Sequence, residues 1–276
     1  MSHNNQKKIA VINDLSGFGR CSLTVAIPVI SHMGIQCCPV PTSIFSNHTG
    51  FKEYFFDDYT DKIQDYVDHW KKLKLEFEGI YTGFLGSELQ INIVKQFIKD
   101  FKTERTKVIV DPVMGDNGVA YATYNAQMCS EMKSLVEYAD ILTPNVTEAC
   151  ILTDTNYRKE GFSEKELEMM ARTLSDSGPD KVVITGIKQG NYISNLVYEK
   201  DSSIKIIKTH QAGEERSGTG DVFASIIAAD SVNGVDFSVS VKKASTFVKK
   251  SIEKSIKLNI PKTDGVCFEE VLKGLR

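Results

Sequence analysis

The chain has 276 residues, of which 41% are hydrophobic and 25% charged, so it is long enough to bury one large core. Its formal net charge is −3 with both signs mixed along the sequence, which argues against binding to nucleic acid or to a membrane surface. The longest apolar run, from Val25 to Ile30, is too short to span a membrane, and the polar first eight residues show no signal-peptide pattern. We therefore expect a single domain, residues 1–276, in the cytoplasm.

Strand-like and helix-like segments alternate along the chain. Short β-branched runs read as strands, and longer segments with helical periodicity separate them. The predicted strands are Ile9–Ile12, Gly79–Tyr81, Val108–Val110, Ile141–Leu142 and Val182–Ile184. This alternation is typical of βαβ units, so we expect an α/β fold with a mostly parallel central sheet and helices on both faces.

The segments between the strands show apolar residues at intervals of three and four, which marks buried helix faces. Trp70 belongs to the first of these faces, so we expect it in the core. Two segments instead read as peripheral strands or lids: residues 35–56 are extended and turn-rich, and residues 191–208 are hairpin-like. The predicted helical faces run through residues 59–75, 89–101, 167–174, 222–232 and 237–256.

The six cysteines, at positions 21, 37, 38, 129, 150 and 267, lack the spacing of a zinc site. Cys37 and Cys38 are adjacent and would point to opposite faces of a strand. We therefore expect the cysteines to behave as small buried apolar residues in a reducing compartment, without disulfides or a structural metal.

Polar segments follow most of the predicted strands. In an open parallel sheet, ligands bind beyond the carboxyl ends of the strands, so these segments are the place to look for chemistry. They would line one rim with acidic, amide and hydroxyl groups. The segments are Asp14–Gly19, Asp111–Asp116, Thr143–Glu148 and Thr185–Gly186.

The segment Gly218-Thr219-Gly220-Asp221 stands directly before an apolar helix pattern. Its glycines let backbone N–H groups converge, and the helix adds its positive end, so the segment suits phosphate oxygens. Asp221 is either a cap of this helix or a base that accepts a hydroxyl proton during phosphoryl transfer. A carboxylate beside an anion hole favours the second interpretation.

Two further pairs of polar residues have both structural and functional interpretations. Asn145 and Glu148 match a capping box at a helix start, but they would also face a Mg²⁺-bound nucleotide. Asp111 and Asp116 flank a turn, yet they could hold Mg²⁺ at the end of a strand.

The remaining motifs are weak taken singly. Residues 46–50 form a polar turn in which His48 is equally a structural histidine. Residues 14–19 lack the full GxGxxG spacing of a dinucleotide site, and no GxxxxGK[ST] sequence occurs, so an NAD-dependent oxidoreductase and a P-loop enzyme are disfavoured.

Taken together, these motifs resemble those of the pyridoxal/pyridoxine (vitamin B6) kinases of the ribokinase superfamily. The resemblance covers nearly the whole chain, and six landmarks arrive in the family's order, which is far more specific than any one. They are Phe45–Gly50, Thr82–Gly86, Asp111–Asp116, Thr143–Glu148, Val182–Thr185 and Gly218–Asp221.

The resemblance implies an ATP-dependent kinase with a ribokinase-like fold that acts on the 5′-hydroxymethyl group of a small B6 molecule. It implies Mg²⁺, a monovalent cation such as K⁺, and a homodimer formed through peripheral strands. Asp221 would be the base, with Gly218, Thr219 and Gly220 as the anion hole. The acceptor would contact Asp14, Ser46, His48, Thr49, Phe84 and Tyr121; the nucleotide would contact Asp111, Thr143, Asn145, Glu148, Thr185 and Thr219; and Mg²⁺ would contact Asp111, Asp116 and Glu148.

The sequence departs from the family pattern at the acceptor end. Asp14 stands where pyridoxal kinases usually have Ser, and its surroundings are similar to the DSSGGxG segment of hydroxymethylpyrimidine (phosphate) kinases of thiamine synthesis. Phe84 stands where the family often has Tyr. The GTGD ending and the FSNHTG segment favour a B6 substrate, with a pyrimidine alcohol as the alternative. A sugar kinase and a non-catalytic small-molecule-binding protein on the same fold are further alternatives.

Overall fold

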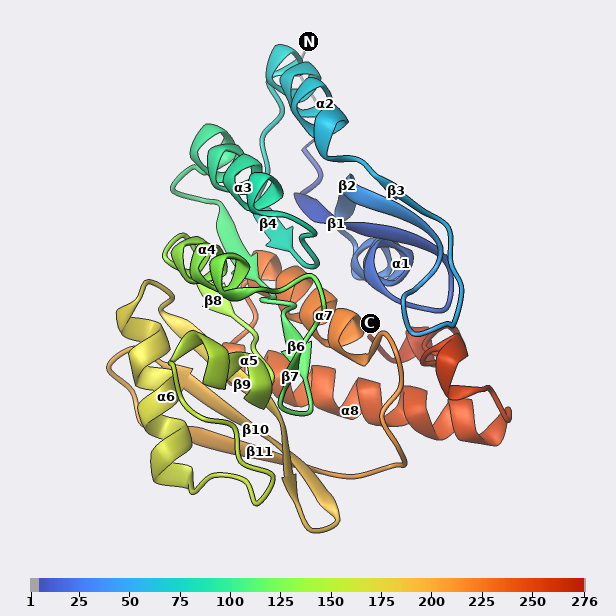
Figure 1. Cartoon of the computed structure of the whole chain (residues 1–276), viewed down its shortest axis with the longest axis vertical. Coiled ribbons are helices and arrows are strands. Elements are labelled where there is room, and N and C mark those ends of the chain that lie inside the picture. The colour runs from blue at the N-terminus through green and yellow to red at the C-terminus, as the bar shows by residue number, and fades with distance from the viewer. Residues whose placement is uncertain (1–4, 276) are drawn as a thin grey trace.

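The computed structural model describes residues 5–275, so part of the expected polar amino-terminal segment lies outside the described residues. A nine-stranded sheet forms its centre, in the order β11-β10-β9-β8-β5-β4-β1-β2-β3 (Figure 1). The six strands from β9 to β2 in this order run parallel, whereas β3, β10 and β11 are antiparallel additions. The strands are β1 (Lys8–Phe18), β2 (Gln36–Asn47), β3 (Phe56–Asp58), β4 (Gly79–Thr82), β5 (Lys107–Val110), β8 (Ile141–Leu142), β9 (Lys181–Gln189), β10 (Tyr192–Glu199) and β11 (Lys205–His210).

Helices cover both faces of this sheet and bury a separate apolar cluster on each (Figure 1). The mostly parallel α/β fold with peripheral β segments, predicted from the sequence, is therefore confirmed. One face carries α2 (Thr60–Leu73), α3 (Glu88–Phe101), α4 (Ala126–Val136), α5 (Val146–Leu152) and α6 (Glu164–Asp176), and the other carries α1 (Ser22–His32), α7 (Thr219–Asn233) and α8 (Phe237–Lys257). Smaller elements are the hairpin β6 (Gly115–Asp116) and β7 (Val119–Ala120) and the 3₁₀ turns η1 (Lys262–Asp264) and η2 (Glu269–Leu275).

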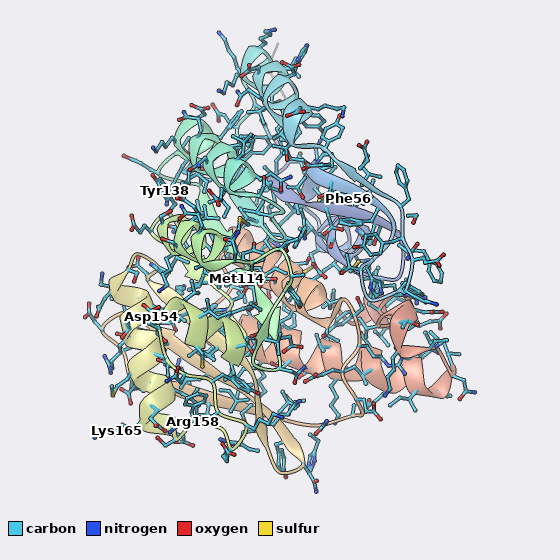
Figure 2. All side chains as sticks on the ribbon, viewed as in Figure 1. Phe56, Met114, Tyr138, Asp154, Arg158 and Lys165 are labelled. Carbon is cyan, nitrogen blue, oxygen red and sulfur yellow. The ribbon has the colours of Figure 1, made fainter. Side chains whose placement is uncertain are left out.

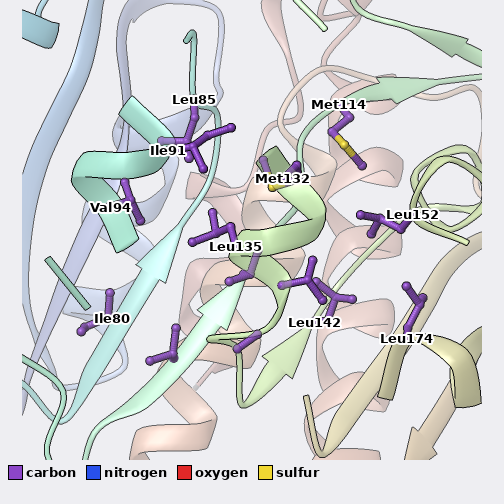
Figure 3. Packing of buried hydrophobic residues seen from close by; sticks show 14 of the residues in the cluster. Ile80, Leu85, Ile91, Val94, Met114, Met132, Leu135, Leu142, Leu152 and Leu174 are labelled. Carbon is purple, nitrogen blue, oxygen red and sulfur yellow. The ribbon is translucent and has the colours of Figure 1, made fainter. Parts of the chain in front are cut away.

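The two clusters follow from the strand period of two, which sends successive side chains to opposite faces. In β1, Ala10 and Ile12 join the cluster beneath α2 to α6, while Ile9 and Val11 join the cluster beneath α1, α7 and α8. Figure 3 shows part of the first cluster, where Leu142 of the sheet lies near Leu135 of α4. The inner strands are thus buried on both sides, as a parallel sheet requires.

The predicted helix faces are confirmed for α6 and are partly wrong for α3. Leu89 was expected in the α3 face but is 56% exposed, and the face that packs on the sheet includes Ile91 and Val94 instead. The sequence of α3 contains two interleaved apolar stripes, and contact with the sheet decides between them. Trp70 of α2 packs against Phe77 with ring centroids 5.3 Å apart, so its predicted place at the core is confirmed.

Two strands extend well beyond their predicted ends. The strand predicted to stop at Ile12 continues to Phe18, because β2 pairs with it past an irregularity near Asn13. The strand predicted to stop at Ile184 continues to Gln189, because β10 folds back against it. Hydrophobic runs reveal only the parts of strands that are buried on both faces, so these polar extensions carried no signal.

The cysteines are free thiols, and the adjacent pair in β2 divides between the two faces of the sheet. Cys38 joins the cluster beneath α2 to α6, and the half-buried Cys37 packs against the opposite cluster. Between residues 5 and 275, no helix combines the length and the apolar character needed to cross a membrane.

Candidate active site

A cavity of about 1140 Å³ lies at the carboxyl ends of the parallel strands. It is lined by every site residue predicted from the sequence except Ser46. The hydroxyl of Ser46 accepts a hydrogen bond from the Phe55 N–H at 2.8 Å within the β2–β3 pairing, and its side chain is exposed. The structure therefore does not bring Ser46 to the candidate site.

Asp14 is buried at the end of the cavity formed by β1 and β2. Its carboxyl accepts hydrogen bonds from the Ser22 hydroxyl at 2.5 Å and from the Ser16 hydroxyl at 2.9 Å. Burial raises the pKa of Asp14, and these two donors only partly oppose the rise. This end of the cavity therefore presents a carboxyl group whose orientation is fixed by two neighbouring hydroxyls.

His48 lines the cavity, but both of its ring nitrogens face the backbone. The Gly50 N–H donates to Nδ1 at 3.0 Å, so Nε2 carries the proton and donates to the Thr263 carbonyl at 2.7 Å. This arrangement ties the β2 end of the cavity to η1. His48 thus has a structural role whatever else it contacts, while Thr49 and Phe84 line the cavity beside it.

The start of α7 presents its backbone N–H groups without a side-chain cap. Gly218 is the N-cap residue with φ of +79°, and a Cβ atom there would lie 2.0 Å from the Arg20 carbonyl oxygen. Only glycine fits this turn. A Cβ atom at Gly220 would instead meet nothing within 4 Å, so the first helical turn faces open space in the cavity. This is the geometry of an anion site at a helix start.

The carboxyl of Asp221 lies in that first turn, where the N–H groups of Ser22 and of Asp221 itself donate hydrogen bonds to it. The Asn13 side-chain amide donates to its Oδ1 at 3.4 Å. Burial raises the pKa of Asp221 to about 6, with a further contribution from the nearby Asp14 carboxyl. A carboxyl with this pKa is mostly ionised at neutral pH and is well matched to accept a proton.

The start of α5 carries the capping box expected from the sequence, and the structure confirms it. The Asn145 side chain accepts from the Glu148 N–H at 2.9 Å, and the Glu148 carboxyl accepts from the Asn145 N–H at 2.8 Å. The second carboxyl oxygen of Glu148 accepts from the Met114 N–H at 3.2 Å; Met114 is labelled in Figure 2. The buried carboxyl of Glu148 is therefore held on both oxygens.

The carboxyl groups of Asp111, Asp116 and Glu148 lie near one another in the part of the cavity beside the start of α5. Burial raises the pKa of Asp111 to about 7, with a further rise from Asp221, although the Thr143 hydroxyl donates to it at 2.9 Å. Burial and the Asp111 charge raise the pKa of Glu148 well above its usual value. Asp116 is exposed, but the loss of water around its carboxyl group and the nearby charge of Glu215 still raise its pKa. A cation placed among these groups would relieve their mutual repulsion.

These oxygen donors fit the chemistry of Mg²⁺, which prefers carboxylates, phosphates and water. In the part of the chain that the structure describes, no three His, Cys, Asp or Glu side chains are arranged to hold a metal ion by themselves. An ion at this place would need further oxygen ligands, such as those of a bound phosphate group and water. Tyr121 lines the cavity above these carboxyls, and its pKa is raised by burial and by Glu148.

The far end of the cavity contains two residues that the sequence did not single out, Asn195 and Ser245. A bulge in β9 gives Gly186 a φ of +74°, and its N–H donates to the Asn195 side chain of β10 at 3.3 Å. Asn195 in turn donates to the Ser245 hydroxyl of α8 at 2.8 Å. Both side chains line the cavity near Thr185. A bulge depends on strand pairing, so it leaves no pattern in the sequence.

Comparison with known proteins gives one family and several relatives. The family model described as phosphomethylpyrimidine kinase matches residues 26–265. A protein from Bacteroides thetaiotaomicron, provisionally described as a phosphomethylpyrimidine kinase, has a crystal structure 38% identical in sequence, with a TM-score of 0.97 over 100% of this chain and 96% of that one. Its orthorhombic crystal form, solved with pyridoxal, has a TM-score of 0.93 over 98% and 96% of the two chains.

Two curated relatives belong to different vitamin pathways. A thiamine biosynthetic bifunctional enzyme of Arabidopsis thaliana is 25% identical over 257 residues, and a pyridoxal kinase of Ovis aries is 28% identical over 218 residues. The aligned regions cover 90% and 71% of this chain, respectively. The chain spans 46% of the Arabidopsis enzyme and 68% of the Ovis one, so it is similar to about half of the bifunctional protein.

Proposed function

The chain belongs to the phosphomethylpyrimidine kinase family, which makes it an ATP-dependent phosphotransferase, and from that premise we propose that it phosphorylates the 5′-hydroxymethyl group of a vitamin B6 molecule. Its neighbours among solved structures confirm the ribokinase-like fold that the sequence motifs predicted. The acceptor would be pyridoxal, pyridoxine or pyridoxamine. The product would be the corresponding 5′-phosphate.

The observation that carries this proposal is the start of α7. Its N–H groups face open space at Gly220, and the buried carboxylate of Asp221 lies in the same turn and lines the same cavity. Phosphoryl transfer to an alcohol needs both of these parts, an acceptor for the hydroxyl proton and donors for the phosphoryl oxygens. A protein that only binds a small molecule has no need of a carboxylate with a pKa near 6 at this place.

In the proposed reaction, Asp221 accepts the proton of the acceptor hydroxyl as that oxygen forms a bond to the γ-phosphorus of ATP. The bond between the γ-phosphorus and the β,γ-bridging oxygen breaks, and ADP leaves. The N–H groups of residues 218–220 hold the phosphoryl oxygens as negative charge moves onto the leaving oxygen. Thr143, Asn145 and Thr185 would orient the nucleotide phosphates. Mg²⁺, held by Asp111, Asp116 and Glu148 together with the phosphates, would neutralise part of their charge.

The residues at the acceptor end of the cavity are compatible with both candidate substrates, a B6 vitamer and a pyrimidine alcohol. Asp14 is held as a hydrogen-bond acceptor, so it would pair with a ring N–H or a ring hydroxyl, and Phe84, Thr49 and Tyr121 line the surrounding wall. The crystal of the 38% identical relative with pyridoxal supports a B6 ring in such a cavity. The family description and the Arabidopsis relative support a pyrimidine alcohol as the second candidate.

A side-by-side acceptor assay tests the proposal. Purified protein would be given ATP and Mg²⁺ with each B6 vitamer and with hydroxymethylpyrimidine, and phosphorylated products would be identified by mass spectrometry. We expect a 5′-phosphate from at least one B6 vitamer, with a higher kcat/KM than for hydroxymethylpyrimidine. A higher kcat/KM for the pyrimidine would contradict the B6 assignment, and no ester from any acceptor would contradict the kinase assignment.

We further propose that two copies associate through the edge of the sheet at β3. The exposed aromatic side chains Tyr54, Phe55 and Phe56 lie there beside the cavity, and Figure 2 labels Phe56. A short edge strand with exposed aromatic side chains can pair with a second copy of the same edge. Light scattering would show a dimer, and Phe55→Asp should shift it toward the monomer. A monomeric wild-type protein would contradict the proposal.

A further inference from the structure

The landmark Thr82–Gly86 covers the last residue of β4 and the turn that follows it, and most of its residues have no place in the reaction just described. Gly83 in this turn lies against the side chain of Asn13 in β1. A Cβ atom at Gly83 would lie 2.3 Å from the Asn13 Nδ2 atom, closer than real Cβ contacts allow. The glycine therefore leaves room for one particular side chain, and the question is what that side chain does.

The amide of Asn13 is completely buried and its orientation is fixed by two backbone donors. Its Oδ1 accepts from the Asp14 N–H at 3.0 Å and from the Phe84 N–H at 2.9 Å. An amide oxygen with two N–H donors cannot exchange places with the NH₂ group without losing both bonds. The Nδ2 atom is therefore held on the opposite side, where it donates to the Asp221 Oδ1 at 3.4 Å.

We propose that Asn13 is a positioning residue, whose locked amide fixes the direction in which the Asp221 carboxylate faces the acceptor hydroxyl. This inference rests on the proposed role of Asp221 as the base. It gives the Thr82–Gly86 turn a function, because Gly83 makes room for the amide and Phe84 supplies one of its two fixing bonds. It also links the base to the acceptor end of the cavity, because the other fixing bond comes from Asp14.

The surroundings of Asp221 explain why one amide matters. The titratable groups that face it are Asp14 of β1, Cys21 ahead of α1, Tyr81 of β4, Asp111 after β5 and Tyr121 after β7. None of them carries a positive charge. The Ser22 N–H and the Asn13 amide are the neighbouring residues that lower the pKa of Asp221. Losing the amide should therefore raise that pKa and leave the carboxyl held only by the backbone N–H groups of Ser22 and of Asp221 itself.

Asn13→Asp is the sharpest test, because the new side chain has the same shape. It keeps an oxygen for the two backbone donors and replaces only the donor that faces Asp221. With the best acceptor at pH 7.5, we expect the single-turnover rate to fall by about 10- to 100-fold, as for a misplaced catalytic group. The acid limb of the pH–rate profile should move to higher pH, and the KM for ATP should stay within about twofold.

A matched control is Asn125→Asp at the start of α4. Asn125 accepts a hydrogen bond from the Met128 N–H, so aspartate keeps this cap and adds the same charge outside the cavity. Gly83→Ala is a second variant that pushes on the amide without changing it, and it should show the same fall in rate. Its control is Gly274→Ala, where an added Cβ meets nothing within 4 Å.

Three outcomes separate the inference from the proposed function. If wild-type protein phosphorylates an acceptor but Asn13→Asp and Gly83→Ala match their controls in rate and pH profile, the positioning role is wrong. If Asn13→Asp is slow while its acid limb stays in place, Asn13 acts through something other than Asp221, and the inference is again overturned. If wild-type protein phosphorylates no acceptor, the proposed function fails first, and the inference fails with it.

Discussion

The helices α5 and α6 begin with the same local structure in two different places. Asn145 and Glu148 form a capping box at α5, and Ser163 and Glu166 form one at α6. The pKa of Glu166 is lowered to about 2, because Ser163 and Arg158 donate hydrogen bonds to it at the surface. The pKa of Glu148 is raised well above its usual value, because it is buried beside Asp111.

This contrast shows that a capping box does not decide whether its carboxylate has a second role. Both carboxylates satisfy backbone N–H groups, yet only Glu148 stands at the carboxyl end of a parallel strand among other acidic groups. The start of α7 agrees with this, since the Asp221 carboxyl accepts hydrogen bonds from backbone N–H groups and also lines the cavity. Hydrogen-bond partners and burial distinguish α5 from α6, whereas residue type and spacing do not.

The largest effect is expected at α7. Asp221→Asn keeps the shape of the side chain, so the fold should survive, and removal of a general base should lower kcat by about 10²–10⁴. The KM values for ATP and the acceptor should change little, because neither depends on that proton transfer. Steady-state kinetics on the purified variant measures this, with circular dichroism as the check on folding. A folded variant with near-normal kcat would mean that Asp221, like Glu166, is only a carboxylate at a helix start and not the catalytic base.

The next largest effect is expected at Gly220, one residue before Asp221. An alanine methyl group meets no protein atom there and improves helix propensity, so stability should be unchanged or slightly higher. The methyl would occupy the space proposed for the phosphoryl group, so kcat/KM should fall by about 10². Gly274→Ala, equally unobstructed, is the control for the substitution itself. An active Gly220→Ala enzyme would mean that the phosphoryl group lies elsewhere.

The comparison of α5 with α6 is tested by Glu148→Gln beside Glu166→Gln. Glutamine can still accept one backbone N–H, so both variants should keep most of their caps. Glu148→Gln also loses a charge beside the phosphates, so we expect roughly tenfold lower activity at low Mg²⁺, partly recovered at high Mg²⁺. Glu166→Gln should leave the Mg²⁺ dependence unchanged. Identical Mg²⁺ curves for the two variants would reduce Glu148 to a helix cap.

The smallest effect is expected at Asp14, which distinguishes acceptors from one another. Asp14→Ser restores the residue type that is usual in the similar B6 kinases, so it should shift the ratio of kcat/KM values among the vitamers by about fivefold. The KM for ATP should stay within about twofold. Competition between two vitamers in one reaction measures the ratio directly. An equal loss for every acceptor, together with weakened ATP binding, would contradict the placement of Asp14 at the acceptor end.

The sequence predicted the parts of the molecule that depend on local chemistry. Strand β8 has the predicted bounds, and the capping box at Asn145 is present at a helix start as predicted, because a buried apolar run and short-range hydrogen bonds specify them. The rim of polar residues also gathers at one cavity as expected, since parallel strands bring their carboxyl ends to one edge of the sheet.

The parts that the sequence could not predict depend on partners far along the chain. Ser46 pairs with β3 instead of facing the cavity, and His48 is held by Thr263, more than 200 residues later. Asn195 reaches the cavity through a bulge in β9. The sequence shows Asn13 only as one residue of a strand. Its proposed role follows from the structure, which places its side chain against Gly83 and Asp221.

The central claim, that the carboxylate of Asp221 must be ionised to accept a proton, is tested most directly by the pH dependence of the wild-type single-turnover rate. The pKa of Asp221 is raised to about 6, so its ionised fraction, and the rate with it, should fall about tenfold per pH unit below pH 6. The measurement should use two acceptors whose own pKa values differ. A fall in rate caused by the enzyme then occurs at the same pH with both acceptors, whereas one caused by an acceptor does not. A limb near pH 6 shared by both acceptors is the predicted result, and a rate that stays level from pH 8 to pH 5 would contradict the account.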